Sequence, residues 1–345
     1  MKSQTTIKEI AQALQISIST VSRALQNNPR IGLKTRERVW EMAKKLHYIP
    51  NPAAMLLRKK QTMTIGVILP TLTEEFFSLA ITGIEDVVME KGYHVLVSQS
   101  RDSYEREKEL VESFLRTRVD GVLVSVAGQT NHYAHFKKLE EYGIPTVFFD
   151  RVPRNLPAHK VRCNVEQGAK EAIQFLYDRG IRRIALLNGP SNLAVSDERL
   201  NGYLTALHNF NLFTSPRYIR STNLSREDTW QQMEHFISLP EPPEAILCFN
   251  DYIALYAMQY GSHRGIRPNH DMAFISFANL PITQFMGNPP MASVEQFAYQ
   301  MGSQAADLLC QCIDHPTPGN PYFEKIIETE LVIHNFSDSD HRLHP

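Results

Sequence analysis

A short polar face near the amino terminus combines hydroxyl groups with one long cation. Its members are Ser19, Thr20, Ser22 and Arg23. Hydroxyl and guanidinium groups can hydrogen-bond to base edges and to phosphate oxygens, so this face is suited to nucleic acid. The same stretch carries apolar residues at helical spacing, which are Ile18, Val21, Ala24 and Leu25. We therefore predict a recognition helix here, with Ser17 as its N-cap.

A preceding helix is predicted to brace this one. Thr6 and Glu9 form a capping box, in which a hydroxyl and a carboxylate can satisfy the free amides of a first turn. An apolar stripe follows, made of Ile7, Ile10, Ala11 and Leu14, and the helix should end near Gln15. Two short helices joined this tightly indicate a helix-turn-helix. A third helix over 34–46, after a turn at 27–30, should close a three-helix head.

Charge separates the first 61 residues from the rest of the chain. They hold 12 lysines and arginines against 3 aspartates and glutamates, a net charge of +9, and the remainder carries −10, which gives the near-neutral total of −1. A basic segment with capped helices is typical of a phosphate-binding domain. The alternative is a solvated basic tail, which would not need capped amphipathic helices.

Residues 6–70 closely resemble the headpiece, hinge and first core strand of the LacI (lactose-repressor) family of bacterial transcription factors. The resembling run begins TIKEIAQALQISISTVSRALQNNPRIG and ends MTIGVILP, and later motifs extend the resemblance over almost the whole chain. It implies a sequence-specific DNA-binding transcriptional regulator that acts as a repressor and whose operator affinity is controlled by a small-molecule effector. It further implies a homodimer that presents two heads to double-stranded, pseudo-palindromic operator DNA.

The resemblance also assigns DNA contacts, with bases read mainly by Ile18, Ser19 and Arg23. The full predicted DNA-binding set is Thr6, Ser17, Ile18, Ser19, Thr20, Ser22, Arg23, Asn27, Arg30, Tyr48, Asn51 and Leu57. Leu57 matches the leucine that the family wedges into the minor groove from a hinge helix. The alternatives are that Arg23 is an unpaired surface cation and that the hinge is a flexible basic linker. Gly32 departs from the family, where a serine usually caps the third helix.

From Met63 onward the apolar pattern changes to strand-like runs that alternate with helical ones. This order indicates right-handed βαβ units and parallel sheets. The strands are too many for one sheet, so we predict an α/β fold with two Rossmann-like lobes, similar to periplasmic binding proteins, behind the small all-α head. The predicted boundaries are a head at 1–49, a hinge at 50–62, a first lobe at 63–162 with 295–325, a second lobe at 163–294 with 326–336, and a tail at 337–345.

Ligands of open parallel sheets bind outside the carboxyl ends of the strands, and in a bilobed protein those ends face each other across a cleft. The segments that follow the predicted strands are 71–77, 125–128, 150–151, 188–199, 250–251 and 277–279. The family's effector-pocket motifs resemble VFFDR, NGPSNLAVSDERLNGY and CFNDYIALYAM of this chain. The predicted effector-binding residues are Thr73, Phe76, Phe77, Ser125, Asp150, Arg151, Arg199, Asn250, Asp251 and Ala278. Arg199 matches the arginine that clamps ligand oxygens.

Several of these residues have structural alternatives. Asp150 and Arg151 could be an adjacent surface pair, and Phe76 and Phe77 could both belong to the core. The pair 250–251 could cap the following helix, which is compatible with contacting a ligand.

The core departs from the family pattern where acceptors are expected. Ala278 stands in place of an aspartate that often binds sugar hydroxyls, and Asn164-Val165 replaces a frequent Asp-Asn. A carboxylate can accept two hydroxyl hydrogen bonds and a methyl group accepts none. We therefore expect a sugar-like effector that is either an acidic derivative or a sugar bound in an unusual pose.

Other classes of protein are less compatible with the sequence. The first residues contain no apolar signal segment and no run is long enough to span a bilayer, which favours the bacterial cytoplasm, near the nucleoid, over a secreted solute-binding protein. The strand ending at Leu69 is followed by no glycine-rich phosphate turn, and no catalytic motif is recognisable, so we expect neither an enzyme nor a cofactor. Four scattered cysteines, Cys163, Cys248, Cys310 and Cys312, should be free thiols without a metal. The tail lacks the leucine heptads of the family's tetramers, which favours a dimer.

Overall fold

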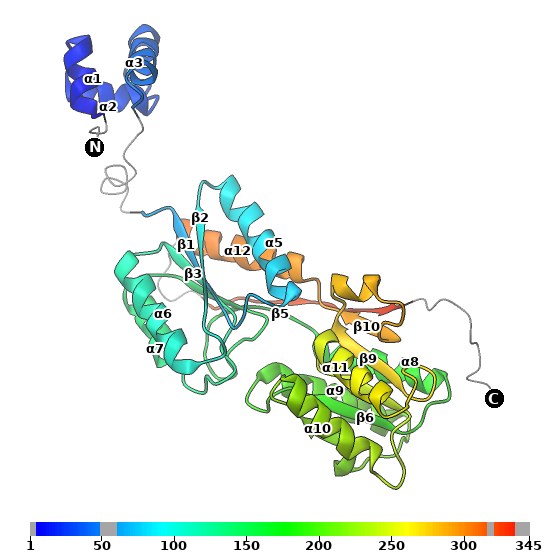
Figure 1. Ribbon diagram of the computed structural model, residues 1–345. Coiled ribbons are helices and arrows are strands. Elements are labelled where there is room, and N and C mark those ends of the chain that lie inside the picture. The colour runs from blue at the N-terminus through cyan, green and yellow to red at the C-terminus, as the bar shows by residue number, and fades with distance from the viewer. Residues whose placement is uncertain (1–4, 49–60, 316–320, 335–345) are drawn as a thin grey trace. The chain divides into compact units, whose positions relative to one another are not determined.

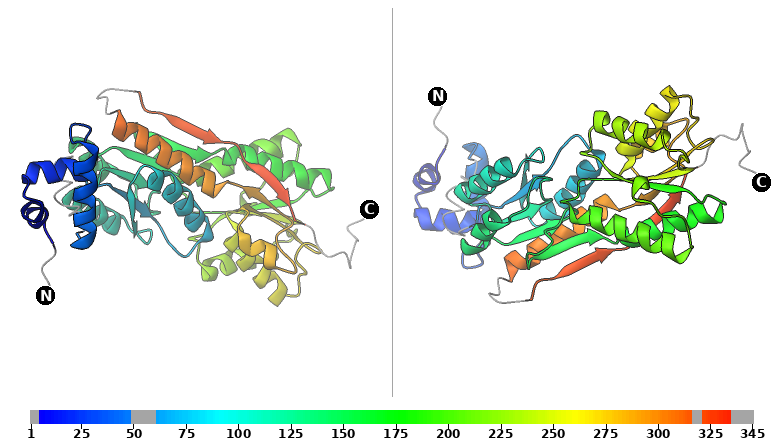
Figure 2. Two further views of the ribbon diagram at one scale, coloured as in Figure 1. Left: turned by 90° about the horizontal axis from the view of Figure 1, so that it is seen from above. Right: turned by 90° about the horizontal axis from the view of Figure 1, so that it is seen from below.

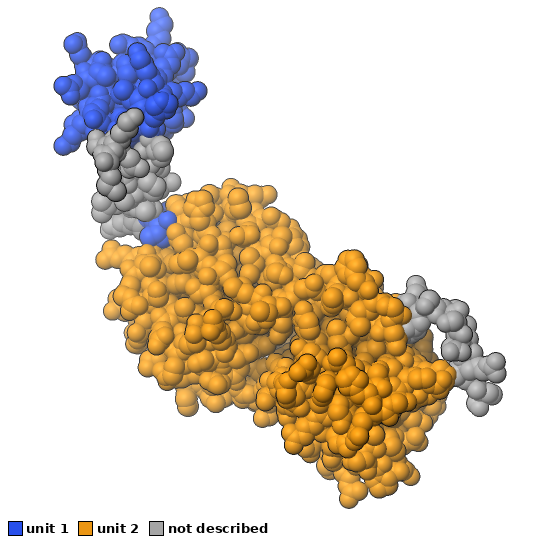
Figure 3. Space-filling view, viewed as in Figure 1, with its two compact units in different colours: residues 1–62 blue, residues 63–345 orange. Residues whose placement is uncertain are grey.

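A computed structural model of the protein describes residues 5–48, 61–315 and 321–334. The chain divides into two compact units, residues 1–62 and 63–345, which are coloured separately in Figure 3. Asn51 and Leu57, and with them most of the predicted hinge and all of the predicted tail, lie outside the described residues. Within the described part of the chain, no helix combines the length and hydropathy needed to cross a membrane.

The first unit is a three-helix head. Its helices are α1 (Ile7–Leu14), α2 (Ile18–Leu25) and α3 (Leu33–Lys45). The Glu9 carboxylate accepts a hydrogen bond from the Thr6 amide (2.6 Å), and the Ser17 hydroxyl accepts one from the Thr20 amide (3.1 Å). Both predicted N-terminal caps are therefore present. The apolar stripes of the three helices meet in a small core made of Ile10, Ala11, Val21, Ala24, Val39 and Ala43.

The first lobe of the second unit is a six-stranded parallel sheet with the strand order β11-β5-β4-β3-β1-β2. Its strands are β1 (Thr64–Leu69), β2 (His94–Gln99), β3 (Gly121–Val124), β4 (Thr146–Phe149), β5 (His159–Cys163) and β11 (Glu324–Ile327). Four helices cover it: α5 (Glu75–Glu90), α6 (Tyr104–Thr117), α7 (Ala134–Glu141) and α12 (Ala298–Asp314). Helices α5 and α12 lie side by side on one face, and α6 and α7 lie on the other (Figures 1 and 2).

The second lobe repeats this arrangement with the strand order β12-β10-β9-β8-β6-β7. Its strands are β6 (Ile184–Asn188), β7 (Ile219–Ser221), β8 (Ala245–Cys248), β9 (Ala273–Ala278), β10 (Ala292–Glu295) and β12 (Glu330–Ile333), of which β12 is antiparallel to β10. Its helices are α8 (Val165–Asp178), α9 (Ala194–Asn209), α10 (Arg226–Ile237) and α11 (Asp251–His263), with 3-10 turns η1 (Pro216–Tyr218) and η2 (Pro281–Phe285). The predicted α/β class, with two parallel-sheet lobes behind a helical head, is confirmed.

The sequence of each central strand is apolar on both faces because helices cover both. Within β1, Val67 packs with the cluster that includes α5, whereas Ile68 packs with the cluster that includes α6 and α7. A half-exposed sheet would need polar residues at every second position. Uninterrupted apolar runs such as Ile65–Leu69 are thus the expected sequence of a sheet buried between two helix layers.

The chain crosses between the lobes three times, after β5, after β10 and after β11. The last crossing corrects one predicted boundary. Ile326 was assigned to the second lobe, but Ile326 and Ile327 pair with β5 in the first sheet, and the chain enters the second sheet at Glu330. The physical reason is that one short segment, 324–333, supplies an edge strand to each sheet, with only Glu328 and Thr329 between the two strands.

Candidate functional site

A cavity lies between the two lobes, at the carboxyl ends of their strands. The space among its lining residues amounts to about 410 Å³, part of which is open solvent. Its lining residues are Glu74, Phe76, Phe77, Asp150, Arg151, Val195, Arg199, Phe249, Asn250, Ala278, Leu280 and Gln296. Seven predicted residues therefore come together here, namely Phe76, Phe77, Asp150, Arg151, Arg199, Asn250 and Ala278. They come from both lobes, as expected for strand-end loops that face each other.

Arg199 is the most unusual side chain in this cavity. It projects from α9, only 3% of it is exposed, and its guanidinium lies between the rings of Phe249 (4.3 Å) and Phe277 (4.4 Å). Its Nη2 donates to the Gln296 side-chain oxygen (3.3 Å), but its Nε and Nη1 have no hydrogen-bond partner. Burial lowers the pKa of Arg199 to about 10, and the nearby Asp150 carboxylate opposes this shift. A buried cation with unused donors is arranged to receive oxygen atoms of another molecule.

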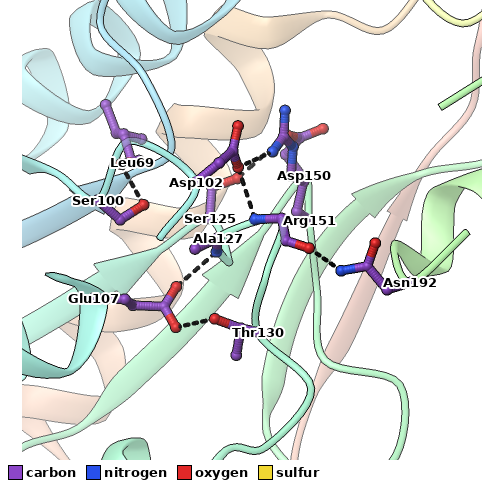
Figure 4. Close-up of polar contacts among 11 residues, drawn as sticks. Leu69, Ser100, Asp102, Glu107, Ser125, Ala127, Thr130, Asp150, Arg151 and Asn192 are labelled. Atoms are coloured by element: carbon purple, nitrogen blue, oxygen red, sulfur yellow. Dashed lines mark hydrogen bonds and ion pairs between the residues drawn. The ribbon is translucent and has the colours of Figure 1, made fainter. Parts of the chain in front are cut away.

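Arg151 is fixed by a hydrogen-bond network in the first lobe (Figure 4). Its Nη1 donates to Asp102 Oδ1 (2.7 Å), which also accepts from the Gly128 amide (2.7 Å). The Ser125 hydroxyl donates to Asp150 Oδ2 (3.3 Å). Burial raises the pKa of Asp150, and the arginines at 151 and 199 oppose this effect. The pair 150–151 is therefore part of the cavity wall and is not a free surface pair.

The loop after β3 is held in place from behind by a buried carboxylate. Glu107 of α6 accepts hydrogen bonds from the Ala127 amide (2.6 Å) and the Thr130 hydroxyl (2.7 Å) (Figure 4). It also accepts one from the His135 ring (2.9 Å). All four residues are buried. The loop 125–130 is consequently a rigid platform beneath Asp150 and Arg151.

Contacts between the lobes surround the cavity. Arg154 of the first lobe donates through Nη2 to the Ser191 and Leu193 carbonyls, at 2.8 Å each. From the second lobe, the Asn192 amide donates to the Gly128 carbonyl (Figure 4). These contacts join the loops near Arg151 to the loop that precedes α9, the helix of Arg199, so any movement of one lobe against the other changes the cavity wall.

Three predicted effector-binding residues do not line the cavity. Ser125 lies behind Asp150, to which it donates. Thr73 is exposed, and its hydroxyl is paired with that of Thr71 (2.8 Å). Asp251 is fully buried and accepts hydrogen bonds from the Leu280 amide (2.6 Å), from Ser293 (2.8 Å) and from Ser276. The prediction that Asp251 contacts the effector is therefore corrected. Its buried carboxylate accepts hydrogen bonds that connect α11 to β9, to β10 and to the Leu280 loop. Asn250 both lines the cavity and caps α11, since its side chain accepts from the Ile253 amide (3.0 Å).

Asp251 should make stability depend on pH. Burial raises its pKa from 3.8 to about 6, partly offset by its hydrogen bonds. Between these values the native state holds a proton that the unfolded state has released, so the free energy of unfolding should fall by up to about 3 kcal/mol as pH rises from 4 to above 6. Asp251→Asn keeps the acceptor for Leu280 and removes the titration. In urea unfolding at pH 5, 6 and 7, the variant should gain stability relative to wild type as pH rises, and parallel curves would contradict this assignment.

Five cavity residues were not named from the sequence, namely Glu74, Val195, Phe249, Leu280 and Gln296. Glu74 and Val195 lie inside strand-end segments that had been assigned to the cleft. Phe249 immediately precedes such a segment and belongs to the motif CFNDY. Leu280 directly follows another such segment, 277–279. Only Gln296 had no local signal, because the crossing after β10 brings it to the cavity.

Most of the predicted DNA-contact residues in the described part of the head are exposed. Ile18, Ser19 and Arg23 of α2 are exposed, and Ile18 is 43% exposed although it is apolar. At the start of α2, the Ser17 hydroxyl lies 2.8 Å from the Ser19 hydroxyl and 2.8 Å from the Thr20 hydroxyl. Thr6, Asn27 and Arg30 are exposed, Ser22 is half-buried, and Tyr48 packs against the head core. Gly32 caps α3 without a side chain, as expected.

A helix-turn-helix head in one chain with a two-lobed core and a polar cleft defines a ligand-responsive DNA-binding protein. Residues 6–51 match the family described as bacterial regulatory proteins of the lacI family. Residues 62–335 match the family described as periplasmic binding proteins and sugar binding domain of the LacI family. The chain therefore belongs to the LacI family and is a DNA-binding transcriptional regulator with an effector-binding core.

Individual relatives agree with this assignment. The chain is 30% identical over 328 residues to the HTH-type transcriptional repressor CytR of Escherichia coli (strain K12), with 95% of each chain covered. It is 29% identical to the HTH-type transcriptional repressor PurR of Vibrio cholerae serotype O1 (strain M66-2), with 95% of this chain and 98% of the relative covered. The lac repressor dimer bound to operator and the anti-inducer ONPF matches with a TM-score of 0.83 and 25% identity, over 96% of this chain and 98% of that one. A CelR-cellobiose complex shares the fold, with a TM-score of 0.71 and 24% identity over 96% and 99%.

Proposed function

We propose that the protein is a homodimeric repressor that binds a pseudo-palindromic operator and releases or retains it according to a small polar effector in the cleft. The observation that carries this proposal is the buried Arg199, whose unpartnered donors border a cavity between lobes of the same chain that bears a basic helix-turn-helix head. A buried guanidinium with free donors has a high cost that a ligand with oxygen acceptors would remove.

The head is proposed to read DNA through α2. The exposed Ser19 and Arg23 would reach base edges in the major groove, and Ile18 would contact a thymine methyl group. Leu57 would enter the central minor groove. The DNA backbone would be contacted by Thr6, Ser17, Thr20, Ser22, Asn27, Arg30, Tyr48 and Asn51. A dimer fits this arrangement because a two-fold axis places two recognition helices one helical turn apart. The related lac repressor is a dimer on its operator.

The effector is proposed to be a sugar-like molecule without a required negative charge. The substitution at Ala278 leaves two alternatives, an acidic derivative or a sugar in an unusual pose, and we favour the second because Glu74 and Asp150 both border the cavity and balance the charges of Arg151 and Arg199. The aromatic residues Phe76, Phe77 and Phe249 would cover flat faces of a ring. The family description of a sugar-binding domain supports this class.

Control of DNA binding would work through movement of the lobes. An effector that favours one arrangement of the lobes shifts the protein toward it by its difference in affinity for the two arrangements. By linkage, operator DNA must change effector affinity by the same factor. A sensor of this kind acts in the cytoplasm with the DNA and needs no catalysis, which agrees with relatives that are repressors.

The DNA-reading role of Arg23 can be tested by substitution. Arg23→Ala should weaken binding to the specific operator by about 1–3 kcal/mol, the range for one good base contact. Binding to random DNA of equal length should change far less. Fluorescence anisotropy with labelled operator and random duplexes measures both. An equal loss on the two duplexes would show that Arg23 contacts only phosphate, and no loss on either would remove it from the interface.

A further inference from the structure

The acidic side chains around the cavity differ in whether they already have hydrogen-bond donors. Asp102 accepts from Arg151 and Gly128, Asp150 accepts from Ser125, and Glu75 accepts from the Ile282 amide (3.1 Å). Glu74 lines the cavity, and among the described residues its carboxylate accepts no hydrogen bond. Glu74 is therefore the one carboxylate of these four for which no hydrogen bond is found in the described part of the chain.

The surroundings of Glu74 disfavour its charged, unpaired carboxylate. The side chain is half-buried, and burial raises its pKa, while the positive charge of Arg151 opposes the rise and the charges of Asp150 and Asp102 add to it. A half-buried carboxylate without donors has lost part of its hydration, and a ligand donor would replace it. Two N–H groups of the buried Arg199 in the same cavity also have no hydrogen-bond partner. The cavity thus offers free acceptors and free donors at once.

We propose that Glu74 determines effector specificity by accepting a hydrogen bond from a hydroxyl or amino group of the effector, while Arg199 donates to an oxygen of the same molecule. This inference rests on the proposed function of the cleft and deepens it. The ligand class that satisfies both groups is a neutral polyhydroxylated ring or its amino derivative. A dianion such as a sugar phosphate would meet Glu74 and Asp150 and is rejected.

The proposal predicts discrimination as well as affinity. A site built to bond a ligand hydroxyl rejects the analogue that lacks it, because the buried protein group is then left unpaired. Wild-type protein should therefore prefer a sugar over the deoxy analogue that lacks the hydroxyl facing Glu74. Once the carboxylate is replaced, this preference should shrink. A residue that only supported the fold would change both affinities equally.

The experiment uses the full-length protein and a fixed set of probes. Thermal shift first compares the probes, which are glucose, galactose, ribose, their deoxy and amino derivatives, gluconate, glucose 6-phosphate, adenosine and cytidine. Calorimetry then measures the affinities of the binders and of their deoxy analogues. The variants are Glu74→Gln, Glu74→Met and, as control, Glu85→Gln. Glu85 lies on α5, the helix that begins after Glu74, is exposed and does not line the cavity, so this control removes the same charge elsewhere.

We expect Glu74→Gln to weaken the best neutral or amino-bearing binder by roughly 10- to 100-fold, as for a hydrogen bond to a charged group. Glu74→Met should weaken it at least as much and remove the preference over the deoxy analogue, and Glu85→Gln should change neither. Unchanged affinity and preference in both Glu74 variants would overturn the proposal. So would preferential binding of gluconate or glucose 6-phosphate, or no binding of any probe by wild type. Operator binding without a ligand separates these outcomes from failure of the DNA-binding function, because all the variants should retain it.

Discussion

Arg199→Met is expected to abolish the effector response while leaving operator binding intact. The substitution removes the donors that border the cavity but keeps a long apolar side chain between Phe249 and Phe277. Removing one partner of a buried charged contact costs about 2–5 kcal/mol, so effector affinity should fall about 30-fold or more. Calorimetry with the effector identified from the probe set measures this loss, and anisotropy measures the operator affinity.

The stability of Arg199→Met provides an independent test of the same idea. The wild-type guanidinium is desolvated and only partly bonded, so its removal offsets the lost hydrogen bond to Gln296. We expect the free energy of unfolding to change by less than about 1 kcal/mol. Arg179→Met is the matched control, since Arg179 also stacks on a ring, that of Phe175 at 3.5 Å, away from the cavity. A large loss of stability with an unchanged effector response would show that Arg199 is structural.

Gly302→Ala is expected to disrupt the packing of the first lobe. Gly302 of α12 faces α5 so closely that an added Cβ would lie 2.0 Å from the Ala80 carbonyl oxygen. That contact is with backbone, which cannot rotate away, and the opposing Gly83 is equally close to the Tyr299 carbonyl (2.1 Å). Overpacking of this kind costs about 1–3 kcal/mol or more, and we expect at least the upper value here. Urea unfolding of the full chain measures the loss.

Gly261→Ala is the control for this prediction. Gly261 lies in α11, where an added Cβ would meet its nearest neighbour, Ile266, at an ordinary 3.7 Å. Alanine is favoured over glycine within helices, so this variant should be neutral or more stable by about 0.5–1 kcal/mol. Similar losses in the two variants would mean that the glycine between α5 and α12 has no special packing role.

The head was predictable because its signals are local. The capping box at Thr6, the cap at Ser17 and the apolar spacing of α2 each operate within a few residues, and each is found in the structure. The central strands were also predictable, because burial on both faces of the sheet gives uninterrupted apolar runs that can be recognised without knowledge of the neighbouring strands. Two strands at or near a sheet edge were harder to predict. The edge strand β7 reads IRS, and β5, which lies next to the edge strand β11, reads HKVRC, so polar residues interrupt the apolar pattern in both.

The cavity was only partly predictable because some of its lining residues are brought there by the tertiary structure alone. Strand-end positions located Asp150, Arg151 and Arg199 without knowledge of the pairing. Gln296 reaches the cavity at a crossing between lobes, and no spacing in the sequence predicts that contact. The opposite error occurred at Asp251, where position suggested a ligand contact but burial and three hydrogen-bond donors assign the carboxylate to the fold.

The most direct test of the whole account is binding of the full-length protein to DNA from upstream of its own and neighbouring genes, at about 50 mM and 200 mM salt, with and without each probe ligand. We expect tight binding to one site and a steep fall in affinity as salt rises. A neutral or amino-bearing ligand should shift the operator affinity of the wild-type protein, and the same ligand should not shift that of the Arg199→Met variant. Equal binding to all DNA fragments, with no ligand altering it, would contradict the claim that this chain is an effector-controlled operator-binding regulator.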